Sequence, residues 1–347
     1  MTSPAANSSS PSSPPPGALP AAPAQLIDAG GAVHTGRFEG LTGDIDWSHL
    51  GPPLARGAWW RHFHHKRWFY VALATDEVFC AVAMVDIGWT STAFGYVFDR
   101  RRALVTAAFS QDGLPGIGAR LADRCAGGAV QGFHFAGQHI ECRHDPASRC
   151  YRLQLRSPAM QIDAEFDDFG PNLLAVGTVA GGSVHATQKS STRALRGELR
   201  LSAGRHALDT GVASFDYSNG LLARDTAWRW ASAHSAQVGF NLQAGYFGAQ
   251  ENALWLDGQL FPLGAARFDF DPRRPMAAWQ LRTEDGLLDL TFRPEGLRRE
   301  DKNLLVAASR YVQPIGVFSG WVKASANATP RRVQDLVGVT EDHQSRW

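Results

Sequence analysis

Asp216 lies in the most polar and aromatic stretch of the sequence, residues 184–257. An aromatic residue flanks it on each side, and a Trp-x-Trp pair, Trp228 and Trp230, follows it. A carboxylic acid that burial keeps protonated can give a proton to an apolar alkene, and aromatic faces stabilise the resulting carbocation. The pattern therefore points to a hydratase, cyclase or isomerase with Asp216 as general acid. The alternative is an aspartate that caps its own turn before Asn219-Gly220.

Other polar and aromatic residues of this stretch are candidates for ligand binding beside Asp216. Lys189 is one of only four lysines in an arginine-rich chain, and alternation places it on the same strand face as Thr187. It is either a ligand anchor or the ion-pair partner of Glu251 or Asp216. The predicted ligand-binding residues are Thr187, Lys189, Tyr217, Arg224, Trp228, Trp230, Asn241, Glu251 and Asn252. Salt bridges for the charged residues and core packing for the tryptophans are the simpler alternatives.

The histidines do not predict a metal site. His62 and His64 share one strand face, and His139 with Glu141 shares another, but no spacing brings the two pairs together. Zinc needs three or four converging ligands. The sequence also contains neither a phosphate-binding Gly-rich loop nor a nucleophile elbow. We therefore expect neither a metal nor a cofactor.

Composition excludes several broad classes of function. Of the 347 residues, 44% are hydrophobic and 19% charged, and the formal net charge is +1. This balance is typical of a globular protein and lacks the basic footprint of a nucleic-acid-binding protein. No window is apolar enough to form a transmembrane segment, and the N-terminus lacks the features of a signal peptide. A cytoplasmic protein with reduced cysteines is the expectation.

The elements that must position these residues are strands. Apolar and polar residues alternate over 238–243 and again over 287–292, where Arg293-Pro294 is expected to end the strand. The 35 glycines and 19 prolines divide the chain into short pieces, and residues 117–124 are the one modest helix candidate. About twenty short strands at this spacing predict an all-β fold of two closed antiparallel barrels.

The predicted organisation has three parts. Residues 1–24 are rich in Pro, Ser and Ala and are expected to form a disordered leader. Residues 25–175 are expected to form the N-terminal barrel, and residues 176–347 the C-terminal barrel.

Several motifs together carry a resemblance to a known family. They are Leu26-Ile27-Asp28-x-Gly30, Lys66-Arg67-Trp68, Thr187-Gln188-Lys189, Asp216-Tyr217 with Asn219-Gly220, Arg224-x-Thr226-x-Trp228-x-Trp230, Gly239-x-Asn241-Leu242, Glu251-Asn252-x-Leu254-Trp255-x-Asp257-Gly258 and Gly338-x-x-Glu341-Asp342-x-x-x-Arg346-Trp347. The chain resembles the bacterial domain-of-unknown-function family 2804 over almost its whole length beyond the leader.

A more distant likeness concerns the order of a polar strand, an aspartate, an arginine and a Trp-x-Trp strand. This order is similar to the second half of carotenoid hydratases, whose relatives include tocopherol cyclase. Those proteins have two lipocalin-like barrels and act on isoprenoids. Their usual Trp-x-Asp-His signature is replaced here by Phe215-Asp216-Tyr217. The resemblance implies two lipocalin-like barrels packed together.

Three functions follow as hypotheses. The first is a protein that binds a hydrophobic small molecule, a lipid or an isoprenoid, in a barrel pocket. The second is an enzyme that acts on such a molecule with Asp216. The third is a structural protein whose barrels are filled by their own side chains. A cavity, and the place of Asp216 relative to it, distinguishes them.

Overall fold

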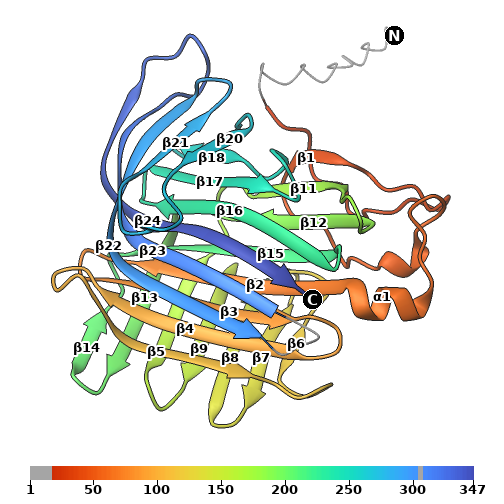
Figure 1. Ribbon diagram of the computed structural model, residues 1–347, viewed down its shortest axis with the longest axis horizontal. Coiled ribbons are helices and arrows are strands. Elements are labelled where there is room, and N and C mark those ends of the chain that lie inside the picture. The colour runs from red at the N-terminus through yellow and green to blue at the C-terminus, as the bar shows by residue number, and fades with distance from the viewer. Residues whose placement is uncertain (1–17, 304–307) are drawn as a thin grey trace, which may run out of the picture.

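The computed structural model describes residues 18–347 with the exception of 304–307. Strands make up nearly all of its regular structure (Figure 1), as the period-two alternation predicts. Within the described residues, the helical elements are one α-helix, α1 (Ala58–His64), and one 3-10 turn, η1 (Trp47–His49). The four cysteines are buried and form no disulfide. No described helix is both long and apolar enough to cross a membrane.

The first sheet contains fifteen antiparallel strands. Their bounds are β1 (Gly36–Glu39), β2 (His65–Ala74), β3 (Val78–Asp86), β4 (Ser91–Asp99), β5 (Leu104–Asp112), β6 (Ala119–Leu121), β7 (Val130–Phe135), β8 (Gln138–Asp145), β9 (Cys150–Arg156), β10 (Gln161–Asp167), β11 (Leu173–Thr178), β12 (Val184–Lys189), β13 (Arg193–Leu201), β14 (Gly204–Ala207) and β15 (Val212–Leu221). The main path runs β5-β4-β3-β2-β15-β13-β10-β9-β8-β7-β6, and β12 pairs with β15 beside it. The sheet curls, because β6 at one end of the path contacts β3 near the other.

The second sheet contains nine antiparallel strands in the order β19-β18-β17-β16-β24-β23-β22-β21-β20. Their bounds are β16 (Asp225–His234), β17 (Val238–Gly245), β18 (Ala253–Leu256), β19 (Gln259–Pro262), β20 (Ala266–Asp269), β21 (Trp279–Thr283), β22 (Leu288–Asn303), β23 (Ala308–Val322) and β24 (Arg331–Arg346). This sheet also curls, because β20 contacts β17. The two curled half-barrels confirm the predicted all-β fold.

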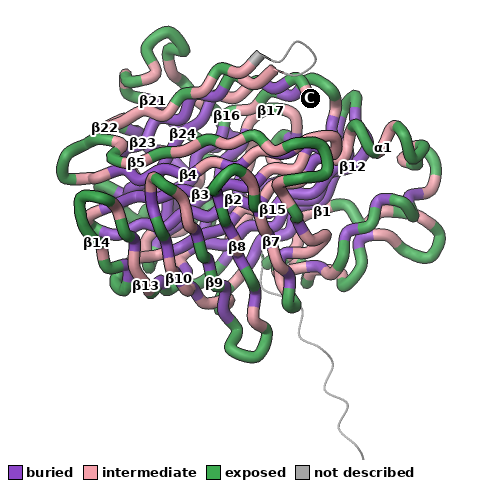
Figure 2. Tube along the Cα trace, turned by 90° about the horizontal axis from the view of Figure 1, so that it is seen from below, coloured by how far each residue is buried: buried purple, intermediate pink, exposed green. Residues whose placement is uncertain are grey.

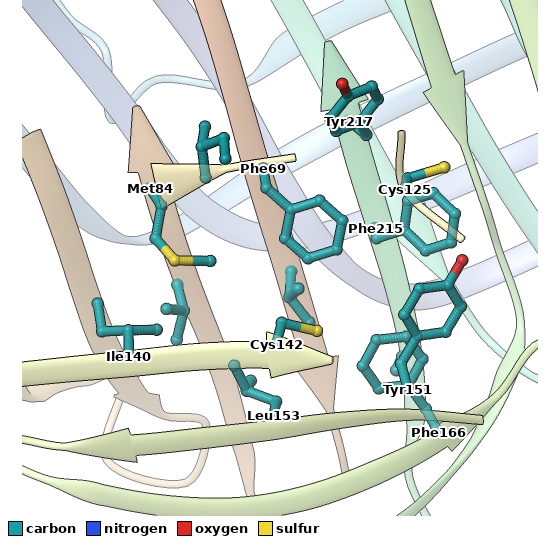
Figure 3. Packing of buried hydrophobic residues seen from close by; sticks show 14 of the residues in the cluster. Phe69, Met84, Cys125, Ile140, Cys142, Tyr151, Leu153, Phe166, Phe215 and Tyr217 are labelled. Atoms are coloured by element: carbon teal, nitrogen blue, oxygen red, sulfur yellow. The ribbon is translucent and has the colours of Figure 1, made fainter. Parts of the chain in front are cut away.

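Alternation along the strands gives each sheet a buried inner face. In β2, Phe69 and Val71 contribute to the apolar interior of the first sheet, and in β15 Phe215 and Tyr217 do the same. Figure 3 shows three of these side chains, Phe69, Phe215 and Tyr217, in that interior. The inner face of the second sheet is filled in the same way around Phe240. Burial is deepest in the middle of the strands, and the turns at the rims are exposed (Figure 2).

A third apolar layer joins the two sheets. Tyr70, Ala81 and Tyr96 of the first sheet pack in it with Trp230 and Ile315 of the second. These residues alternate with those of the two interiors, so both faces of the central strands are covered by protein. The two half-barrels are therefore packed together through a shared core.

The structure also bears on the predicted boundaries. Residues 176–221 continue the first sheet, because β12 and β15 pair with each other and β15 pairs with β2, and the change to the second sheet falls between Leu221 and Asp225. A domain division at residue 175 stays a prediction.

The end of the predicted leader is ordered where the structure describes it. Residues 1–17 lie outside the described residues. The expectation of disorder is wrong for residues 18–24, because the amide of Ala22 donates to the carbonyl of Glu39 (2.8 Å) and Leu19 packs beside Trp255. These contacts are made with β1 and β18, which are distant in sequence.

Candidate active site

A cavity of about 110 Å³ lies between the two sheets, beside the apolar layer that joins them. We call it the inner cavity. It is lined by Trp68, Tyr70, Ala83, Val85, Phe94, Lys189, Asp216, Trp228, Trp230, Tyr246, Glu251, Tyr311, Glu341, His343 and Trp347. Aromatic rings form most of its wall, and its charged groups come from both sheets. Such a surface suits an apolar ligand with a few oriented polar contacts.

A second cavity of about 230 Å³, the outer cavity, adjoins the inner one. The two share Val85, Phe94, Tyr311, His343 and Trp347. The outer cavity also has exposed residues in its wall, among them Asp112 and Arg346. It therefore forms the approach from solvent to the inner cavity.

Strand alternation explains how the site residues reach the inner cavity. Asp216 lies on the face of β15 opposite to Phe215 and Tyr217, and so it points away from the first interior. Trp228 and Trp230 likewise lie on one face of β16, while Ala231 on the other face packs in the second interior. The site consequently occupies the space between the half-barrels, whereas the sequence predicted a ligand inside one barrel.

Lys189, Asp216 and Glu251 form a buried ion cluster, which we call the Lys189 cluster. Lys189 is paired with Asp216 in the β12–β15 register, and its ammonium donates to that carboxylate. The same ammonium lies 2.6 Å from Oε2 of Glu251, in the turn between β17 and β18. The side chains of Lys189 and Glu251 are only 3% and 6% exposed. Both ion-pair partners predicted for Lys189 are therefore present together.

The cluster contains one cation and two carboxylates, so full ionisation would leave a buried net charge of −1. Burial alone would lower the pKa of Lys189, but the two carboxylates outweigh it and raise that pKa. Burial raises the pKa of Glu251; Lys189 opposes this shift and Asp216 reinforces it. Glu251 is thus the carboxyl of the cluster that is favoured to carry a proton.

Hydroxyl groups hold the carboxylate of Asp216. The hydroxyls of Thr187 and Ser218 lie 3.4 Å and 3.3 Å from its Oδ1. Ser218 donates to Thr187 (2.8 Å), and Thr187 is 3.2 Å from the carbonyl of Tyr217. Asp216 lies in the middle of β15 and does not cap a turn.

Asn241 and Asn252 position the second-sheet side of the site. Asn241 accepts from the indole of Trp230 (2.7 Å) and donates to the carbonyl of Glu251 (2.9 Å). Asn252 accepts from the amide of Gln243 (2.6 Å) and donates to the carbonyl of Gly264 (2.9 Å). Neither amide lines the inner cavity. Their contacts fix Trp230 and the turn that carries Glu251.

Two predicted ligand-binding residues lie away from the inner cavity. Tyr217 points into the first interior, and its hydroxyl donates to the carbonyl of Ala122 (2.9 Å). Arg224 is exposed in the connection between the sheets, where its carbonyl accepts from the amide of Trp347 (2.8 Å). The structure brings together Thr187, Lys189, Asp216, Trp228, Trp230 and Glu251, with Asn241 and Asn252 behind them.

A second polar group at the inner cavity, Glu341 and His343 of β24, was not among the residues predicted for the site. Nδ1 of His343 lies 3.1 Å from Oε1 of Glu341, and that carboxylate also accepts from Trp228 (2.9 Å) and Gln313 (3.0 Å). With Nδ1 donating to Glu341, Nε2 of His343 is left to accept. The signal in the sequence was the spacing Glu341-x-His343, which puts both side chains on one strand face.

The accepting nitrogen of His343 faces two hydroxyls. Ser309 lies 2.9 Å and Ser345 2.8 Å from its Nε2. An imidazole oriented by a carboxylate in this way is arranged to act as a base. It stands at the junction of the inner and outer cavities, since His343 lines both.

Tyrosine hydroxyls complete the polar content of the inner cavity. The hydroxyls of Tyr70 and Tyr311 are buried at its wall. Burial raises the pKa of Tyr246 well above its usual value, and Glu251, Asp216 and Glu341 act in the same direction. Tyr246 therefore lies within electrostatic range of the carboxylates from both sides of the cavity and stays a neutral phenol.

Among the described residues, no group of three or more His, Cys, Asp or Glu side chains is arranged to hold a metal ion. The carboxylates, the lysine and the histidine of the inner cavity are arranged to transfer protons beside a wall of aromatic rings.

Comparison with known proteins identifies the family. The family described as "Domain of unknown function (DUF2804)" matches residues 20–347. The chain belongs to this family. A comparison of this DUF2804 chain with curated protein sequences finds no match.

Solved structures share the fold of this DUF2804 chain. Kievitone hydratase from Nectria haematococca is 10% identical with a TM-score of 0.52, over 85% of this chain and 93% of that one. CghA, solved with Sch210972, is 8% identical with a TM-score of 0.54, over 82% of this chain and 88% of that one. At these identities the likeness establishes the two-half-barrel fold alone.

Proposed function

We propose that this protein is an enzyme that transfers a proton to an apolar, unsaturated small molecule held in the inner cavity. The reaction class is that of a hydratase, cyclase or isomerase, and a lipid or isoprenoid is the proposed substrate. The observation that carries the proposal is the Lys189 cluster: two carboxylates share one ammonium at the wall of an aromatic cavity. A fold neighbour that is a hydratase agrees with this class.

The proton donor in this proposal is Glu251. Asp216, the acid predicted from the sequence, shares the ammonium of Lys189, and the raised pKa belongs to Glu251. A protonated Glu251 leaves Lys189 and Asp216 as a neutral pair, so the proton removes the excess negative charge of the cluster. Asp216 then acts by keeping Lys189 charged and the pKa of Glu251 raised.

The O–H bond of Glu251 breaks, and the π electron pair of the alkene forms a C–H bond with that proton. The carbocation that results faces the rings of Trp228 and Trp230, which stabilise it. In a hydratase, water then forms a C–O bond and gives a proton to Nε2 of His343. In a cyclase a second π bond of the substrate attacks the cation, and the new cation loses a neighbouring C–H proton to Nε2 of His343. In an isomerase the first cation loses a neighbouring C–H proton directly to the same nitrogen.

Binding without chemistry is the main alternative to this proposal, because the proposed reaction also begins with binding. The aromatic wall of the inner cavity would bind an apolar molecule with or without chemistry. A purely structural protein would instead leave both cavities empty of ligand.

The test begins with protein purified gently from its own host. Organic-solvent extracts are analysed by mass spectrometry against a control protein of similar size. Any enriched apolar compound is then incubated with the protein in D₂O, and deuterium on carbon is measured by mass spectrometry and NMR. We expect an enriched compound that gains carbon-bound deuterium with wild type and at background rate with Glu251→Gln.

Two further variants make the test decisive. Val85→Trp fills the shared wall of both cavities and should lose the enriched compound, while Glu251→Gln should retain it. Asp216→Asn should slow deuterium transfer without abolishing it. An enriched compound that gains no carbon-bound deuterium with the wild-type protein would favour a binding protein. No enrichment in any preparation would contradict the proposal and favour the structural alternative.

A further inference from the structure

Four of the exposed large apolar side chains lie on segments beside the outer cavity. Among the described residues, seven large hydrophobic side chains are exposed, namely Trp59, Phe63, Leu104, Leu114, Ile117, Phe169 and Met276. Trp59 and Phe63 belong to α1, and Leu114 and Ile117 to the connection between β5 and β6. Trp59 is the most exposed of them, at 79%. An exposed cluster of this kind marks an interaction site.

Helix α1 presents two different aromatic faces. Trp60 and His64, spaced i and i+4, stack at 3.7 Å on the side that packs against the first interior. Trp59 and Phe63, with the same spacing, stack at 6.4 Å on the opposite, exposed side. The half-buried pair, Trp60 and His64, anchors the helix, whereas the exposed pair has ring contacts only within α1, with each other and between Phe63 and His62.

Direct contacts tie α1 to the wall of the outer cavity. The ammonium of Lys66 donates to the carbonyls of Phe63 and Ile87, at 2.7 Å each. A Cβ added to Gly88 would meet the carbonyl of His62 at 2.1 Å, so the β3–β4 turn packs closely on the end of the helix. Ile87 lines the outer cavity. Figure 1 shows α1 at the same end of the molecule as the C-terminus, whose last residue also lines it.

The other exposed pair borders the same turn from its far side. The hydroxyl of Thr90 donates to the carbonyl of Gly113 (3.0 Å), and both residues line the outer cavity. Leu114 and Ile117 follow Gly113 and are bridged to each other. The exposed apolar side chains therefore stand on both sides of the β3–β4 turn, at the opening of the outer cavity.

Charge distinguishes this surface from an ordinary hydrophobic patch. Residues 47–75 contain no Asp or Glu. Arg56 and Arg61 form no ion pair with a described residue and donate to main-chain carbonyls, Arg56 to Pro53 and Arg61 to Arg56 itself (2.8 and 2.7 Å), while Asp46 lies within electrostatic range of Arg61. Exposed Trp and Phe beside unpaired arginines suit the interface of an anionic bilayer, where aromatic rings lie at the headgroups and arginine meets phosphate.

We infer that Trp59, Phe63, Leu114 and Ile117, with Arg56 and Arg61, form a docking surface for an anionic lipid membrane. On a membrane, the outer cavity opens at the level where apolar molecules leave the bilayer. The ligand of the proposed function would then enter without crossing water. Docking itself does not depend on any reaction in the inner cavity, and it is measured without turnover.

Vesicle co-sedimentation of the full-length protein tests this inference. The probes are vesicles of phosphatidylcholine alone and vesicles with about 30 mol% phosphatidylglycerol. We expect binding to the anionic vesicles that Trp59→Ser/Phe63→Ser weakens at least about tenfold, since two apolar anchors are lost. Arg56→Gln/Arg61→Gln should reduce the preference for anionic over neutral vesicles.

Two controls separate this inference from others. Leu104→Ser/Met276→Ser removes exposed apolar side chains elsewhere and should bind vesicles as wild type does. Glu251→Gln should also bind as wild type, so that failure of the proposed chemistry leaves this result standing. Binding that Trp59→Ser/Phe63→Ser does not change, or no binding to either vesicle, would overturn the inference. So would concentration-dependent self-association that the same variant abolishes, because the surface would then join two copies of the chain.

Discussion

The ammonium of Lys189 lies 2.6 Å from a carboxylate oxygen of Glu251, and this ion pair joins the two sheets at the inner cavity. Lys189 ends β12 of the first sheet, whereas Glu251 precedes β18 of the second. The cluster is therefore complete only when the half-barrels are packed together. Stability, the pKa of Glu251 and the proposed chemistry are linked through this one contact.

Removing the cation should destabilise the protein strongly. Lys189→Met leaves Asp216 and Glu251 buried without compensation, and we expect the free energy of unfolding to fall by about 3–5 kcal/mol. Adding Glu251→Gln to this variant should restore part of the loss. Urea unfolding measures both. Arg267→Met breaks an exposed pair with Glu284 and serves as the control, with an expected change below about 1 kcal/mol. Equal effects of the two substitutions would contradict the buried cluster.

The raised pKa of Glu251 should make stability depend on pH in a defined direction. The unfolded chain releases this proton near the ordinary value of 4.5, while the folded protein retains it to higher pH. The folded state thus binds more protons in this window, and the free energy of unfolding falls as pH rises above 4.5. Glu251→Gln cannot titrate, so its stability should lack this decline. The difference between the two proteins, measured by urea unfolding at several pH values, isolates the group. A difference independent of pH would contradict the raised pKa.

Two buried histidines should produce the opposite slope below pH 6.5, a range that overlaps the one in which Glu251 acts. Burial lowers the pKa of His234 to about 3; burial, with Lys189, lowers that of His185 to about 3 as well. Below pH 6.5, the ordinary pKa of histidine, these two residues take up protons in the unfolded chain but stay neutral in the folded protein. The free energy of unfolding therefore falls as pH falls. His234→Gln should flatten the slope by up to about 1.4 kcal/mol per pH unit. An unaltered slope in His234→Gln would mean that His234 is protonated in the folded protein.

The alternation of apolar and polar residues predicted which segments form strands, but not which face of each strand lines the cavity. The alternation that identified β15 also means that Asp216 and Tyr217 point in opposite directions, so both could not line one cavity. Which face meets the other sheet depends on packing between strands far apart in sequence. For that reason Asp216 lines the inner cavity, whereas Tyr217, predicted to bind the same ligand, fills the first interior.

Other differences have particular local causes. The strand expected to end at Arg293-Pro294 continues as β22 to Asn303, because a bulge between Pro294 and Gly296 accommodates the missing amide. The expected helix at 117–124 contains instead the short strand β6, which pairs with β7. Helix α1 went unpredicted because its half-buried pair, Trp60 and His64, occupies a single face of two turns, too short for a periodic signal. Glu341 and His343 could be recognised as part of the site only from their contacts with residues of β16 and β23.

Gly88 provides a last test, of the contact that holds α1 beside the outer cavity. Its φ of +88° is strained for any residue with a Cβ, and that Cβ would lie 2.1 Å from the carbonyl of His62. Gly116 has a similar φ of +71°, but a Cβ there would meet nothing within 4 Å. Gly116→Ala should therefore lose about 1–2 kcal/mol of stability through backbone strain alone.

Gly88→Ala adds a backbone clash to the same strain, and we expect a larger loss than in Gly116→Ala. Because the clash displaces α1, hydrogen exchange at residues 58–64 should accelerate in Gly88→Ala and not in Gly116→Ala. Vesicle binding should weaken in the same variant, since Trp59 and Phe63 move away from Leu114 and Ile117. Equal losses of stability in the two variants, with unchanged exchange in α1, would mean that the helix is not held by the β3–β4 turn. The docking surface would then lack the fixed arrangement that lets it act as one unit.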